Sequence, residues 1–81
     1  MISKKVRQYI YETLKNYYPP YNIFKQKPWH GNNVYLVLPK QRGLCLGYPP
    51  VFFEKDGVIS CVNRASKEYK EWFYAQNGQF D

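Results

Sequence analysis

The residues best suited to nucleophilic or soft-metal chemistry are Cys45, Cys61 and His30. Structural zinc takes four ligands at recognisable spacing, and this sequence has no Cys-x-x-Cys pair. Both cysteines stand in apolar runs, where cysteine usually behaves as a small buried hydrophobic residue. A disulfide between them would need neighbouring strands and an oxidising compartment. We therefore expect reduced, buried thiols, no metal site and no cofactor.

Four carboxylates could in principle work as acids or bases. Glu54 and Asp56 lie at a predicted hairpin tip, and Glu68 and Glu71 lie on the exposed side of a predicted helix. Surface positions of this kind need no raised pKa. The sequence also lacks a phosphate loop and a dinucleotide fingerprint. It predicts no catalytic residues and a protein that is not an enzyme.

Positive charge is concentrated in the first half of the chain. The formal net charge is +6, and residues 1–40 contain seven of the 12 Lys and Arg residues but one of the six Asp and Glu residues. Between Glu12 and Glu54 there is no acidic residue. This asymmetry predicts one electropositive face that meets an acidic partner.

The candidate binding residues are the basic and aromatic residues of that half. Some recur at three- and four-residue steps opposite the apolar side of a predicted helix, which fits either a solvated face or a surface for phosphates and bases. The tryptophan before His30 could stack on a base, anchor a protein partner or cover the core. The set is Lys4, Arg7, Tyr11, Lys15, Tyr18, Lys25, Lys27, Trp29, His30, Lys40 and Arg42.

Apolar spacing predicts an amphipathic helix over residues 2–18, with Ser3 near its start and Pro19-Pro20 as its stop. Residues 19–33 contain three prolines and read as a long connector pinned to the core. The nearly all-apolar run 34–38 predicts a covered strand. A turn over 39–43 and a return strand over 44–48 follow.

The stretch 51–62 contains the strongest hairpin signal. We predict a three-residue loop, Lys55–Gly57, with Gly57 in the left-handed conformation. That register pairs Glu54 with Val58, Phe53 with Ile59 and Val51 with Cys61, and it buries Val51, Phe53, Ile59 and Cys61 on one face. A two-residue Asp-Gly turn would shift the pairing by one residue and change the buried set.

Ser66 is a suitable N-cap for a last helix over 67–76, with Tyr69, Trp72 and Phe73 on its buried side. The 81 residues then make one domain. We predict an α+β two-layer sandwich of order α-β-β-β(-β)-α: an antiparallel three- to four-stranded meander with two helices on one face.

This order resembles that of the double-stranded-RNA-binding domain. Pro28-Trp29-His30 is similar to the Pro-x-His loop of that family, and Ser66-Lys67 is similar to the opening of its last helix. The sequence departs from the family where Glu68 and Tyr69 replace its lysine cluster, and where aromatic residues replace its alanine-rich last helix. We treat the resemblance as one of topology.

Two functions are consistent with these features. The first is a small non-enzymatic module that contacts nucleic acid through its electropositive N-terminal half. The second is a protein-interaction module, such as an inhibitor or adaptor, that docks on an acidic protein through a Tyr- and Trp-rich basic surface. A homodimer through a sheet edge is compatible with either. We expect a cytoplasmic protein without a membrane partner, because no secretory signal or spanning segment is evident.

Overall fold

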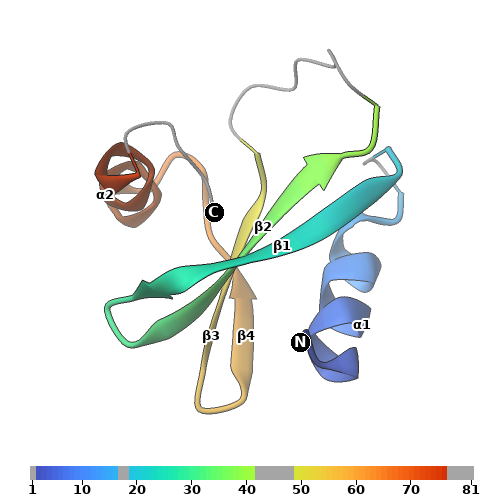
Figure 1. Cartoon of the computed structure of the whole chain (residues 1–81), viewed down its shortest axis with the longest axis horizontal. Helices are drawn as coiled ribbons and strands as arrows, with labels where there is room; N and C mark the ends of the chain where they lie inside the picture. Colours follow the sequence, from blue (N-terminus) through green and yellow to red (C-terminus); the bar gives the residue numbers. More distant parts are fainter. Residues whose placement is uncertain (1, 17–18, 42–48, 77–81) are drawn as a thin grey trace.

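Two helices and four strands make up the computed structural model, which describes residues 2–16, 19–41 and 49–76. The strands form one antiparallel sheet in the order β1-β2-β3-β4 (Figure 1). This arrangement confirms the α+β class, the element order and the meander. The elements are α1 (Lys4–Leu14), β1 (Tyr21–Trp29), β2 (Asn32–Pro39), β3 (Val51–Lys55), β4 (Val58–Cys61) and α2 (Lys67–Ala75).

The two helices cover opposite faces of the sheet, and this corrects the prediction of one shared face. Figure 1 shows α1 and α2 on opposite sides of the strands. Two separate clusters of buried side chains result. The α1 cluster contains Val6, Ile10, Leu14, Tyr35, Val37, Phe52 and Ile59. The α2 cluster contains Val34, Leu36, Val51, Phe53, Val62, Tyr69 and Trp72.

Strand β2 explains why both faces must be covered. Its residues Val34 to Val37 are all buried, and they alternate between the α2 cluster and the α1 cluster. Successive side chains of a strand point to opposite faces, so an all-apolar run exposes apolar surface on both sides. A helix on one face would leave half of β2 in water.

Capping residues define the start of each helix. The hydroxyl of Ser3 accepts a hydrogen bond from the N–H of Val6, and that of Ser66 accepts one from Tyr69. Both caps agree with the sequence prediction. The first helix ends at Leu14, earlier than predicted, and Asn16 lies in the turn that follows. No helix among the described residues is both long and apolar enough to cross a bilayer.

The predicted connector over 19–33 is wrong, because most of it forms β1. As an edge strand, β1 tolerates proline: two prolines precede it, and Pro28 lies where the register with β2 shifts between Gln26 and Trp29. A two-residue turn, His30-Gly31, joins β1 to β2, with φ of 49° and 80°. Both values are positive, as a type I′ hairpin requires.

The β3–β4 hairpin is present, but the predicted register is wrong by one residue. Lys55 pairs with Val58, Glu54 with Ile59 and Phe52 with Cys61. Asp56 and Gly57 both have positive φ, so the loop is the two-residue alternative. The predicted single buried face is also wrong: Val51 and Phe53 belong to the α2 cluster, Phe52 and Ile59 belong to the α1 cluster, and Cys61 is exposed. The predicted return strand 44–48, which includes Cys45, lies outside the described residues.

Candidate nucleic-acid interface

Two contacts fix the rotation of α1 on the sheet. The Nζ of Lys5 donates a hydrogen bond of 2.8 Å to the carbonyl oxygen of Gly57. The ring of Tyr9 packs edge-on against that of Phe52, with the ring centroids 6.0 Å apart. These contacts turn one flank of the helix toward the β3–β4 hairpin. Helical spacing then places Arg7 and Tyr11 on the other flank, where both are exposed.

That other flank lies next to the start of β1. Burial raises the pKa of Tyr21, and the nearby hydroxyl of Tyr11 raises it further. Tyr21 and Ile23 pack against the α1 cluster, and Lys25 lies opposite Tyr35 of the same cluster. Because residues opposite each other in a sheet share a face, Lys25 lies on the α1 side of the sheet.

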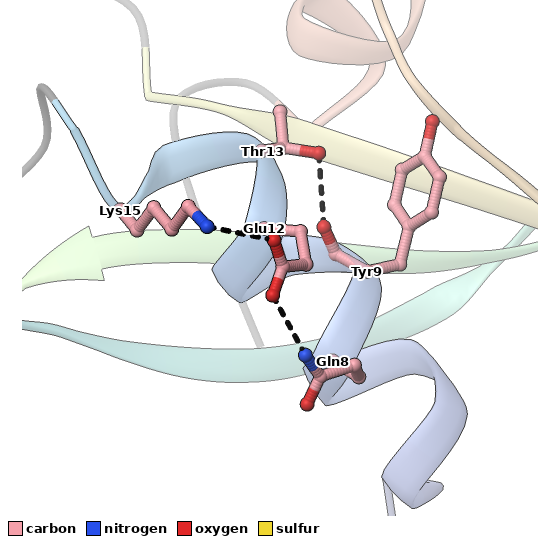
Figure 2. Close-up of polar contacts among 5 residues, drawn as sticks. All are labelled: Gln8, Tyr9, Glu12, Thr13 and Lys15. Carbon is pink, nitrogen blue, oxygen red and sulfur yellow. Dashed lines mark hydrogen bonds and ion pairs between the residues drawn. The ribbon is translucent and has the colours of Figure 1, made fainter.

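The carboxylate of α1 is engaged within the helix itself (Figure 2). Glu12 accepts a hydrogen bond from the amide of Gln8 and forms an ion pair with Lys15, each at 2.9 Å. The hydrogen bond and charge of Glu12 raise the pKa of Lys15. Lys15 is therefore paired, whereas Lys4 and Arg7 form no ion pair within the described part of the chain.

The two hairpins differ in charge. The β1–β2 hairpin contains Lys25 and Lys27, both exposed, and no carboxylate. The β3–β4 hairpin carries Glu54 and Asp56, and Glu54 accepts hydrogen bonds from Asn33 and Tyr35 of β2. Positive charge therefore collects on the free flank of α1 and along the outer strand. We call this surface the basic belt: Lys4, Arg7 and Tyr11 of α1, Lys25 and Lys27 of β1, and Lys40 after β2.

The belt is extended and is not a cluster. The backbone N–H of Lys40 donates to Pro20, so Lys40 lies beside the start of β1. From there β1 runs away from α1 to its hairpin, which Figure 1 shows on the far side of the molecule. Lys25, Lys27 and Lys40 therefore lie along the sheet edge as separate charges, whereas Lys4 and Arg7 lie on α1.

Trp29 lies on the other face of the sheet. It packs against the α2 cluster, its indole N–H is buried, and its ring stacks on His30 with the centroids 4.3 Å apart. This is the core-covering alternative that the sequence left open, so Trp29 and His30 do not join the belt. Tyr18 and Arg42 lie outside the described residues.

The remaining chemistry is sparse. Among the residues that the structure describes, no three His, Cys, Asp or Glu side chains are arranged to hold a metal ion. Partial burial raises the pKa of the Cys61 thiol, against a smaller opposing effect of Arg64. A thiol with a raised pKa is less ionised at neutral pH and therefore less nucleophilic.

Sequence reasoning missed two residues of this region. Lys5 was not singled out, although it joins α1 to the β3–β4 turn. Phe24 is 41% exposed on β1 and was assigned to the connector. The available signal for this strand was the enrichment in residues that favour β-structure, namely Tyr21, Ile23 and Phe24.

Comparison with protein-family models, curated proteins and solved structures finds no match for this chain. The topological resemblance to the double-stranded-RNA-binding domain therefore has no support from a family match.

Proposed function

We propose that the protein is a non-enzymatic module that binds nucleic acid through the basic belt. The observation behind this proposal is the set of exposed bases on α1 and β1, together with the absence of any carboxylate from the β1–β2 hairpin. A phosphate backbone presents negative charges at regular intervals along an extended path. An extended row of cations suits such a ligand better than it suits a small anion, which would need a compact pocket.

The aromatic content of the belt supports the same ligand. Tyr11 is exposed between basic residues of α1 and lies near Tyr21. Aromatic rings beside lysine and arginine bind exposed bases by stacking while the cations bind the phosphates. The proposed roles are therefore phosphate contact for Lys4, Arg7, Lys25, Lys27 and Lys40, and base stacking for Tyr11.

The test is the binding of labelled single- and double-stranded RNA and DNA, followed by fluorescence anisotropy and by NMR shifts. About five phosphate contacts would weaken binding by several hundred-fold between about 50 and 200 mM salt. The NMR shifts are expected on α1 and β1. Absence of binding to every oligonucleotide at low salt would rule out this function.

A matched pair of variants locates the surface. Lys25→Glu/Lys27→Glu reverses two charges on the belt, and Lys67→Glu/Lys70→Glu reverses two exposed charges on α2. Both variants change the net charge equally. We expect the belt variant to reduce the slope of log affinity against log salt by about 2 and the α2 variant to leave it nearly unchanged. Equal losses would indicate nonspecific attraction to net charge.

An acidic protein surface is the second candidate. The large exposed side chains Tyr9 and Tyr11 favour it, because tyrosine is enriched in protein interfaces. Binding to such a partner would depend less steeply on salt than binding to a phosphate backbone. If no oligonucleotide binds, affinity capture with Lys25→Glu/Lys27→Glu as the control tests this candidate.

A further inference from the structure

The register of β1 shows which of its backbone N–H and C=O groups point toward β2 and which point away from the sheet. The N–H of Lys40 donates to the carbonyl of Pro20 at 2.9 Å, and the register continues with Asn22 opposite Leu38 and Phe24 opposite Leu36. Hydrogen-bonded pairs alternate along an antiparallel ladder, so the even-numbered residues of β1 bond to β2. The N–H and C=O groups of Ile23 and Lys25 therefore point away from the sheet.

The next strand supports this assignment independently. The N–H of Val37 donates to Pro50 at 3.0 Å, on the β3 side of β2. The backbone groups of the odd-numbered residues of β2 therefore bond to β3, and those of the even-numbered residues of β2 bond to β1. The outward direction of Ile23 and Lys25 thus follows from two separate hydrogen bonds.

Phe24 lies between these two outward-facing residues and is 41% exposed. It lies opposite Leu36 and therefore on the face of the α2 cluster. An edge strand with outward-facing backbone groups and an exposed aromatic side chain is a template for pairing with another strand. Pro20 before this stretch and Pro28 after it restrict the template to the middle of β1, because proline has no N–H to donate.

We propose that two copies of this chain pair antiparallel through β1, with Phe24 of each copy at the two-fold axis. In this register Ile23 lies opposite Lys25 of the second copy, and each of the two such pairs exchanges two backbone hydrogen bonds. The two Phe24 residues form a non-hydrogen-bonded pair, in which side chains come closest. The two four-stranded sheets become one continuous sheet.

Side-chain charge selects this register, and the self-complementarity of the register fits a second copy of the chain as the occupant. An axis at Lys25 would place two lysines directly opposite each other, which is destabilising. An axis at Ile23 would place Phe24 opposite Asn22 and lose the aromatic pair. The register centred on Phe24 avoids both faults. It is also self-complementary, as a two-fold interface between identical copies must be.

This proposal is independent of nucleic-acid binding, and salt separates the two. Each copy carries a net charge of +6, so the copies repel each other and added salt screens that repulsion. Dimer affinity should therefore rise with salt, whereas affinity for a phosphate backbone should fall. Either result can be obtained without the other.

Analytical ultracentrifugation of the full chain over a wide concentration range tests the dimer. Phe24→Lys introduces a lysine opposite its own copy at the axis and is expected to weaken the dimer at least tenfold. Val58→Lys is the control, because Val58 is 71% exposed on the other edge strand, and it should leave the dimer intact. A wild-type chain that is monomeric up to about 1 mM, or equal effects of the two variants, overturns the proposal.

Amide exchange of the unmodified chain tests the same register without a substitution. In dilute protein the amides of Ile23 and Lys25 should exchange faster than that of Phe24, because the latter bonds to β2. At high concentration all three should be protected. Loss of this concentration dependence would contradict pairing through β1, even if the Phe24→Lys variant failed to fold.

Discussion

The β1–β2 and β3–β4 hairpins make the same turn and use their strands differently. Each loop has two residues with positive φ, His30-Gly31 in the first and Asp56-Gly57 in the second. Strand β3 then buries three consecutive side chains, whereas β1 buries Gln26 alone. Turn geometry therefore fixes that a hairpin forms, and the position of the strand in the sheet decides whether its side chains are buried in the core or exposed at the edge.

A pair of phenylalanine truncations should separate the hairpins most clearly. Phe52 on β3 is fully buried against α1, so Phe52→Ala should cost about 3–5 kcal/mol of unfolding free energy. Phe24 on β1 is partly exposed, so Phe24→Ala should cost below about 1.5 kcal/mol in the monomer. Urea unfolding of dilute protein measures both values. Similar losses would mean that β1 carries as much of the core as β3.

The turn glycines should behave alike. Gly31 and Gly57 have φ of 80° and 79°, and a Cβ built on either meets nothing closer than a lysine side chain at 3.9 and 3.7 Å. Conformation, and not space, therefore sets the cost of a side chain. Gly31→Ala and Gly57→Ala should each lower stability by about 1–2 kcal/mol in thermal unfolding. A clearly larger loss at one position would reveal a further task for that turn.

The smallest expected effect on stability concerns the hydrogen bond between Tyr35 and Glu54, which links the two hairpins. Burial raises the pKa of Tyr35 on β2 above its ordinary value of 10.0, and the charge and hydrogen bond of Glu54 on β3 raise it further. The unfolded chain therefore loses this proton first, so stability should be intact below about pH 10 and decline above it. Urea midpoints at about pH 9 and 11 should fall less for Tyr35→Phe than for the wild type. Equal declines would show that Tyr35 makes no contribution.

The β3–β4 hairpin could be predicted because its sequence contains the strongest turn signal of the chain. Asp-Gly between two apolar runs is a favoured type I′ sequence, whereas His-Gly is not among the favoured ones, so the sequence around it reads as a connector. Histidine adopts positive φ less readily than glycine. Here the Asn32 side chain bonds to the carbonyl of Trp29, and the Trp29 ring stacks on His30. These contacts depend on the folded hairpin and cannot be read from spacing.

The helix caps and the covered strand β2 could be predicted because each depends on residues close in sequence. The placement of the helices could not. Tyr69 and Trp72 were expected against the sheet, but nothing local states which face they choose. The basic stripe of α1 was visible as a periodic pattern, yet the pairing of Lys15 with Glu12 removed one of its members. The packing of Trp29 against the α2 cluster likewise removed a candidate on β1. Long-range packing decided these points.

The placement of the helices on opposite faces has a consequence for the chain while it is being synthesised. The face of the sheet formed by Val34, Leu36, Val51 and Phe53 is covered by α2, which leaves the ribosome after all four strands. Until then a nascent chain can assemble the sheet and α1 while one apolar face has no cover. Exposed apolar surface of this kind promotes aggregation. A chain stalled just before Ser66 should therefore be a substrate for chaperones, whereas the chain extended through Ala75 should not.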